Sequence, residues 1–206
     1  MRVIAIAGSL RRGSFNRLLL RAAQGLAPVG MAIELFELTA IPFYNADVEE
    51  QGDPEPVRTF KEAIRARDAL LIATPEYQHG VSGVLKNALD WASRPPGQSA
   101  MQRKSAAIMG ATPGRMGTAR AQTQLRQSLA YTNTYTVLQP EVLVDRAHEK
   151  FDREGRLSDE PTRELVGKLL HELETLTRAL GQATNSHIHA TMLRYGYREM
   201  WPREAG

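Results

Sequence analysis

The sequence contains no cysteine, which excludes disulfide bonds, thiolate metal sites and a cysteine nucleophile. No stretch approaches the roughly 20 apolar residues of a membrane-spanning helix, so no membrane partner is expected. The N-terminus lacks signal-peptide character because an apolar run begins at residue 3 and leads directly into a polar loop; this makes the cytoplasm the expected location. Lys and Arg outnumber Asp and Glu by only 26 to 23 and are dispersed, so nucleic-acid binding is not expected.

The first seventeen residues, MRVIAIAGSLRRGSFNR, are the stretch around which the chain is organised. Residues 3–7 form a short, β-branched apolar run that is typical of a strand buried on both faces. A polar loop follows Gly8, and apolar residues return at helical spacing from Phe15 onward. A strand, a Gly/Ser/Arg loop and a helix in succession aim backbone N–H groups and a helix dipole at an anion, so we predict a phosphate-binding loop. The alternative is a glycine turn that binds nothing.

Two specialised nucleotide fingerprints are absent from this loop. The chain has no GxxxxGK(S/T), which excludes a P-loop nucleotide hydrolase. It also has no GxGxxG, which disfavours a dinucleotide-binding Rossmann unit. With these two nucleotide sites set aside, the loop is predicted to bind a single phosphate through hydroxyl groups, backbone amides and arginine.

Strand and helix patterns alternate along the 206 residues, whose 42% apolar content suits one compact α/β domain. This alternation predicts a parallel sheet, and five strands favour a flavodoxin-like, doubly wound order 2-1-3-4-5. Strands are predicted at residues 3–7, 31–37, 69–74, 106–109 and 135–144, the last interrupted by Pro140; helices are predicted from Phe15, at 54–66, from Val84, at 119–130 and beyond Leu157, with a loop over 39–56.

The loops after strands one, three and four should converge, because those strands are neighbours in this order. The first loop supplies the phosphate site. The second loop, PEYQHGVSG, and the third, GATPGRMGT, contain glycines that let a flat ring approach backbone N–H groups. A phosphate site at one end and a planar ring site at the other describe FMN. A helix beginning near Thr118 is expected to stabilise the negative charge of the reduced ring.

GSLRRGSFN together with TPEYQHGVSGVLKNALDW resembles the NADPH-dependent FMN reductases, over residues 1 to about 145. That family includes quinone, azo-dye and chromate reductases with a flavodoxin-like fold. The resemblance implies bound FMN, NADPH or NADH as co-substrate, and no catalytic side chain or metal, because the chemistry takes place at flavin N5. The cofactor-binding residues that we expect are Ser9, Arg11, Ser14, Phe15, Asn16, Pro75, Glu76, Tyr77, Gln78, Thr112 and Gly114.

Two departures from the family pattern concern the ring side of the predicted site. The family commonly has Asn after the tyrosine, where this chain has Gln78, and paired glycines in the third loop, where this chain has Arg115 and Met116 between glycines. We expect the backbone of Glu76 to matter more than its carboxylate, since a negative charge beside the ring opposes flavin reduction.

The predicted function is an FMN-dependent NAD(P)H oxidoreductase that passes electrons to a small acceptor such as a quinone, a flavin, an azo dye or chromate. The alternatives are a flavodoxin-like electron carrier, which a net charge of +3 disfavours, and a redox-regulatory flavoprotein. We expect a homodimer or homotetramer whose subunits share the helix over residues 83–92, and the aromatic residue Trp91 is one reason for this expectation. The flavodoxin-like domain should span residues 1–184, with an extension over 185–206 that acts as an oligomerisation arm.

Overall fold

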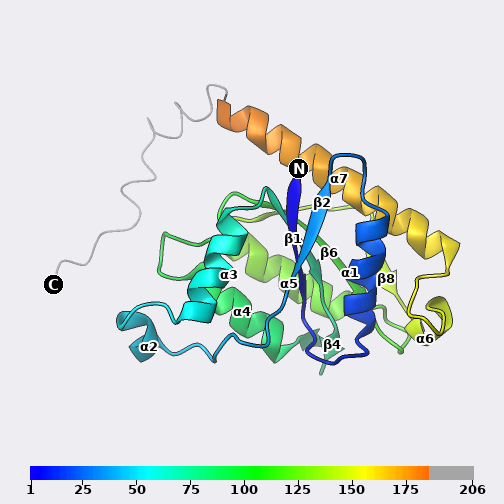
Figure 1. Ribbon diagram of the computed structural model, residues 1–206, viewed down its shortest axis with the longest axis horizontal. Coiled ribbons are helices and arrows are strands. Elements are labelled where there is room, and N and C mark those ends of the chain that lie inside the picture. The colour runs from blue at the N-terminus through cyan, green and yellow to red at the C-terminus, as the bar shows by residue number, and fades with distance from the viewer. Residues whose placement is uncertain (186–206) are drawn as a thin grey trace.

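The computed structural model describes residues 1–185 and contains a parallel sheet covered by helices on both faces (Figure 1). The strand order is β2-β1-β3-β6-β7, and β8 also pairs with β6, so the fifth predicted strand is split into two pieces around Pro140. The flavodoxin-like order 2-1-3-4-5 is therefore confirmed. The strands are β1 (Arg2–Ala7), β2 (Ala32–Phe36), β3 (Ala69–Ala73), β6 (Ser105–Ala111), β7 (Tyr135–Thr136) and β8 (Val142–Val144).

The central strands are buried on both faces, as their continuous apolar runs predict. Every residue of β3 and of β6 is buried. Alternate residues of β1 face opposite layers: Val3 and Ala5 join one hydrophobic cluster, and Ile4 and Ile6 join the other. The first cluster packs under α1 (Phe15–Gly25) and α7 (Glu160–Asn185), and the second under α3 (Glu55–Arg65), α4 (Gly83–Ser93) and α5 (Ala119–Tyr131).

Two short helices and a short hairpin are not predicted from the sequence. Helix α2 (Ala46–Glu50) falls inside the expected loop over 39–56, and α6 (Ala147–Lys150) follows β8. The second loop contains a hairpin of β4 (Glu76–Tyr77) and β5 (Gly80–Val81). Helix α2 has no buried residue, so no hydrophobic period marks it in the sequence.

The predicted extension over 185–206 lies outside the described residues, apart from Asn185, which ends α7. Across residues 1–185, no helix is both long enough and apolar enough to span a membrane.

Candidate cofactor site

The three predicted loops meet at the carboxyl edge of the sheet. Their approach is fixed by strand register, because Ala7 pairs with Ala73 and Ala73 pairs with Met109. Hydrogen bonds continue this pairing into the loops: the Gly8 N–H donates to the Ala73 carbonyl at 2.9 Å, and the Thr74 N–H donates to the Met109 carbonyl at 3.0 Å. The sequence-predicted convergence of the loops is thus confirmed.

The first loop leaves backbone donors free at the start of α1. Ser14 is the N-cap, and its hydroxyl accepts a hydrogen bond from the Arg17 N–H. Within residues 1–185, the N–H groups of Phe15 and Asn16 have no acceptor. Two free N–H groups at a helix N-terminus, backed by the helix dipole, form an anion-binding cradle.

Arginine and serine side chains complete this cradle. The Ser9 hydroxyl accepts from the Arg11 N–H at 3.4 Å. The Arg11 side chain is exposed and folds back over Gly13, where its Nη2 atom lies 3.9 Å from the position that a Cβ would take. No carboxylate of the described chain forms an ion pair with Arg11. The cradle therefore combines free neutral donors with an uncommitted positive charge, and it fits a phosphate group.

Asn16 has a different role from the predicted side-chain donor. Its Nδ2 atom donates to the Ala111 carbonyl at 3.0 Å, and its Oδ1 atom accepts from the Ala111 N–H at 2.9 Å. The residue is only 3% exposed. The side chain therefore ties α1 to the end of β6, and the backbone N–H of Asn16 is left to face a ligand.

Phe15 likewise contributes its backbone, because its ring turns away from the cradle. The ring packs against Phe151, with 5.6 Å between ring centroids. It also contacts the hydrophobic cluster under α1 and α7. Phe15 can therefore reach a ligand only through its N–H.

The hairpin of the second loop turns tightly at Gln78 and His79. Both residues have positive φ, of 44° and 61°, and β4 pairs with β5 across these two residues. A two-residue hairpin turn with positive φ at both positions favours Asn and Gly. Gln78 is thus a strained choice at a position where the family commonly has Asn.

Side chains of the hairpin and of α5 hold each other in place. The Glu76 carboxylate accepts from the Arg120 N–H at 3.0 Å and from the Ala121 N–H at 3.2 Å. The Val81 N–H donates to Gln124 Oε1 at 2.7 Å. The first N–H groups of α5 are therefore already capped, and they are not free to face a reduced ring as the sequence predicts.

The third loop is fastened by the segment around α6. The Gly114 N–H donates to the Thr112 hydroxyl at 3.2 Å, the Ala147 N–H donates to the Thr112 carbonyl, and the Arg146 N–H donates to the Gly114 carbonyl. Gly117 has φ of +54°, and a Cβ there would come within 2.6 Å of the Leu143 backbone. These contacts leave the loop little freedom to move.

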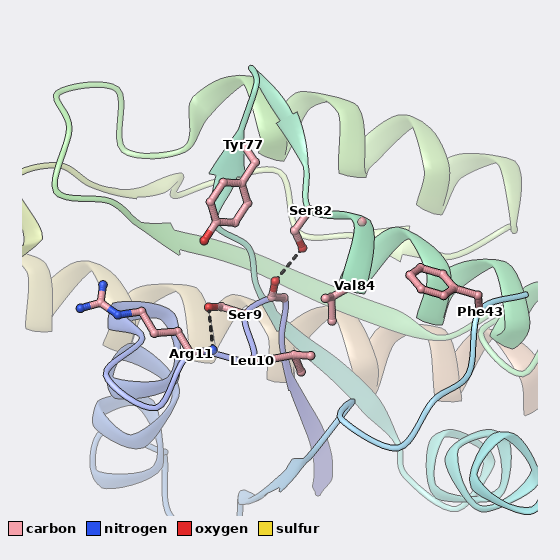
Figure 2. Close-up of a pocket in the computed structure, with 9 residues that line it drawn as sticks. Ser9, Leu10, Arg11, Phe43, Tyr77, Ser82 and Val84 are labelled. Carbon is pink, nitrogen blue, oxygen red and sulfur yellow. Dashed lines mark hydrogen bonds between the residues drawn. The ribbon is translucent and has the colours of Figure 1, made fainter.

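An open cavity of about 370 Å³ lies between the first loop and the start of α4 (Figure 2). The Ser82 hydroxyl donates to the Gly8 carbonyl at 2.6 Å and closes its floor, and Gly8 has no room for a Cβ, which would lie 2.9 Å from Pro75 Cδ. Figure 2 shows Arg11 and Phe43 at opposite ends of the cavity. The lining residues are Gly8, Ser9, Leu10, Arg11, Phe43, Tyr77, Ser82, Gly83 and Val84.

Sequence reasoning misses Phe43, which is 86% exposed. Its two neighbours in the chain, Pro42 and Tyr44, are hydrogen-bonded to α4. The Pro42 carbonyl accepts from Asn87 Nδ2 at 2.8 Å and from Trp91 Nε1 at 2.9 Å. The Tyr44 N–H donates to Asn87 Oδ1 at 2.8 Å. The motif KNALDW predicts a structural helix but does not indicate which loop it holds. No local pattern around Phe43 marks it.

Tyr44, Glu49 and Arg94 form a polar cluster beside these contacts with α4. The Tyr44 hydroxyl donates to Glu49 at 2.7 Å, and Arg94 Nε lies 2.8 Å from the same carboxylate. The hydrogen bond to Glu49 raises the pKa of Tyr44 and that of Arg94. Burial opposes ionisation of Glu49, but the hydrogen bonds from Tyr44 and Arg94 outweigh it and lower the pKa of Glu49. Glu49 and Arg94 are therefore both charged at neutral pH, and Tyr44 is neutral.

Trp91 is a core residue. It is fully buried within its own chain and stacks edge-on against Tyr44, with 5.0 Å between ring centroids. It therefore gives no support to the expectation that α4 is shared between subunits. Lys86 and Asp90 on the same helix form a half-exposed pair four residues apart.

The predicted residues thus fall into four groups around the edge of the sheet. Ser9, Arg11 and Tyr77 line the cavity. Ser14, Phe15 and Asn16 lie at the start of α1; Pro75, Glu76 and Gln78 lie in or beside the hairpin; Thr112 and Gly114 lie in the third loop. In the part of the chain that the structure describes, no group of three or more His, Asp or Glu side chains is placed to hold a metal ion.

Comparison with known families gives a match to NADPH-dependent FMN reductase over residues 1–149. Curated relatives include the NAD(P)H-dependent FMN reductase of Pseudomonas aeruginosa, which is 51% identical over 180 residues, covering 87% of this chain and 97% of the relative. A 2-hydroxy-1,4-benzoquinone reductase from a Burkholderia species is 42% identical over 166 residues, covering 81% of this chain and 90% of the relative.

Among solved structures, the flavoenzyme FerB of Paracoccus denitrificans, an NAD(P)H:(acceptor) oxidoreductase, superposes with a TM-score of 0.77. It is 32% identical, and the match covers 88% of this chain and 97% of FerB. RosB, solved with a bound riboflavin-phosphate intermediate, superposes with a TM-score of 0.70 at 15% identity and supports the fold alone.

Proposed function

The chain belongs to the NADPH-dependent FMN reductase family, and from that premise we propose that it oxidises NADPH or NADH and passes the electrons through bound FMN to a quinone. The observation that carries the proposal is the cradle at the start of α1, where, among the described residues 1–185, the N–H groups of Phe15 and Asn16 have no acceptor and Arg11 has no carboxylate partner. A phosphate there satisfies donors that are otherwise unpaired.

Each group of residues has a distinct task in this proposal. Ser9, Arg11 and Ser14, with the two free N–H groups, hold the phosphate. The hairpin and the third loop hold the ring by backbone and by Tyr77, because the side chains of Glu76 and Thr112 already accept hydrogen bonds within the protein. The protein orients the cofactor and excludes water from one face of it.

Bound FMN supplies the group that accepts a hydride and passes two electrons on. The overall reaction balances as NAD(P)H, one proton and a quinone giving NAD(P)⁺ and a hydroquinone. No side chain has to take up or release the hydride.

A quinone is the favoured acceptor for two reasons. Several relatives are named quinone reductases, including one from Pseudomonas putida that is 41% identical over 157 residues. The cavity end opposite Arg11 is walled by Leu10, Phe43 and Val84, which suits a flat apolar molecule. We also propose that the reaction takes place in the cytoplasm, where NADPH and NADH are available.

We further propose that the working unit is a homo-oligomer in which a second copy covers the open cavity. Phe43, Tyr77 and Met116 are large apolar side chains left exposed around the site. Burying such side chains against a partner is favourable, since each contributes in proportion to the area removed from water. Light scattering of the FMN-loaded protein should give a multiple of the 22.9 kDa chain, and a mass near one chain would contradict this.

Steady-state kinetics test the proposed function. The purified protein should bind FMN, with absorbance bands at roughly 375 and 450 nm, and should oxidise NADPH continuously when benzoquinone is present. Nicotinamide and quinone should use the same cavity in turn, so double-reciprocal plots should be parallel. A flavodoxin-like carrier would bind FMN but sustain no turnover. Intersecting lines in the double-reciprocal plots would contradict the proposal that nicotinamide and quinone share one cavity.

A further inference from the structure

Glu76 caps α5 although it belongs to a different element. The residue at the N-cap position of α5, Thr118, has φ of 69° and makes no capping hydrogen bond with its side chain. Instead, the Glu76 carboxylate reaches from β4 and accepts from the N–H groups of Arg120 and Ala121. Its side chain is 9% exposed, and Arg120 Nη1 lies 3.5 Å from its other oxygen.

This cap changes the charge that α5 presents to the site. An uncapped helix N-terminus carries roughly half a positive charge, and the carboxylate on it, leaving Arg120 aside, more than cancels that charge. Tyr77, the next residue of β4, lines the cavity. The Glu76 carboxylate therefore stands at the ring side of the site with Arg120 beside it, whereas Arg11 stands at the phosphate end.

From this arrangement we infer that Glu76 is a positioning residue that lowers the reduction potential of FMN held in this site, and that Arg120 partly offsets it. The inference rests on the proposed function. Taking up a hydride makes the cofactor more negative, so a nearby carboxylate opposes reduction and a nearby guanidinium favours it. A lower potential makes the reduced cofactor give its two electrons to a quinone more readily.

Two substitutions of opposite sign test the inference in the FMN-loaded protein. Glu76→Gln removes the charge but keeps an oxygen that accepts from the α5 N–H groups. At a fixed solution potential, it should therefore shift the ratio of reduced to oxidised cofactor about tenfold toward the reduced form. For a two-electron couple, that is about 30 mV more positive. Arg120→Gln removes the exposed guanidinium and should shift the ratio in the opposite direction by a smaller factor.

Asp68→Asn is the matched control. The Asp68 carboxylate also accepts a backbone N–H, that of Arg2 at 2.6 Å, but it lies before β3, whereas Glu76 lies after it. The length of the strand, roughly 3.3 Å per residue, separates the two carboxylates, and solvent screens a charge at that distance. Asp68→Asn should leave the potential unchanged.

The outcomes separate this inference from the proposed function. If the unsubstituted protein binds no FMN, the proposed function fails. If it binds FMN and both Glu76→Gln and Arg120→Gln keep its potential, or shift it in the same direction, the inference is overturned. If Glu76→Gln does not fold, Arg120→Gln alone decides: a more negative potential supports the inference, and no shift contradicts it.

Discussion

The two halves of the site differ in how their polar groups are used. At the phosphate end, the N–H groups of Phe15 and Asn16 and the Arg11 guanidinium have no partner within residues 1–185. At the ring end, Glu76 and Gln124 are hydrogen-bonded inside the protein. The difference matches what each half has to bind, because a phosphate is an anion that needs free donors, whereas a neutral ring needs a shaped and rigid surface.

This comparison implies a division of labour. The free donors at the phosphate end should supply most of the affinity for the cofactor, since hydrogen bonds to charged groups contribute about 1.5–3 kcal/mol each. The fixed groups at the ring end should set the shape and the electrostatic potential. Substitutions in the two halves should therefore produce different kinds of defect.

The largest expected effect comes from Asn16, which lies in the phosphate half but serves the scaffold. Asn16→Ala leaves the buried N–H and carbonyl of Ala111 without partners and should lower the free energy of unfolding by about 2–4 kcal/mol, measured by urea denaturation. Asn45→Ala is the control, because Asn45 only caps the exposed helix α2 and should cost about 1 kcal/mol or less. Unchanged stability with weakened FMN binding would make the Asn16 side chain a ligand instead.

The next effect concerns Arg11. Arg11→Ala removes a charge-assisted hydrogen bond to the phosphate and should weaken FMN binding by roughly 10–100-fold, with the lower end favoured because Arg12 lies beside it. Fluorescence titration measures the dissociation constant. Riboflavin lacks the phosphate, so its weaker binding should hardly change.

Arg21→Ala, in helix α1, is the control for Arg11 and should alter neither affinity, because Arg21 is exposed one to two turns beyond the cradle. Equal losses of FMN and riboflavin affinity in Arg11→Ala would place the damage in the ring half or in the fold. Loss of neither would leave the phosphate to serine and backbone donors.

The smallest effect should come from the hairpin turn of the ring half. Gln78 has φ of 44°, a conformation that asparagine adopts more readily, so Gln78→Asn should raise the free energy of unfolding by about 0.5–1 kcal/mol. Thermal unfolding of the apoprotein measures it. Gln51→Asn, at a φ of −83°, should give no gain, and an equal gain there would mean that backbone strain is not the cause.

The sequence predicts the fold well because hydrophobic periodicity marks buried strands and helices. The runs at residues 3–7 and 69–74 could be assigned as buried strands because they are continuously apolar. The pairing of these strands in the sheet then determines where the loops that follow them lie. The free donors at the start of α1 also follow from a local strand–loop–helix pattern. Short exposed elements such as α2 carry no such period and are missed.

Long-range partners of the site residues could not be predicted. Asn16 lies 95 residues from Ala111, and Glu76 lies 44 residues from Arg120, so nothing in the local sequence shows that these side chains are already hydrogen-bonded. The same holds for Phe43, which reaches the cavity only because Asn87 and Trp91 hold Pro42 and Tyr44. Residue type indicates what a side chain can bind, but tertiary contacts decide whether it is free.

The affinity of the unsubstituted protein for FMN relative to riboflavin tests the central claim most directly, because the two ligands share the ring and differ in the phosphate. If the phosphate half supplies most of the affinity through the free N–H groups and Arg11, FMN should bind at least about 100-fold more tightly than riboflavin, equivalent to about 2.8 kcal/mol. Equal dissociation constants for the two ligands would contradict the claim and assign the affinity to the ring half.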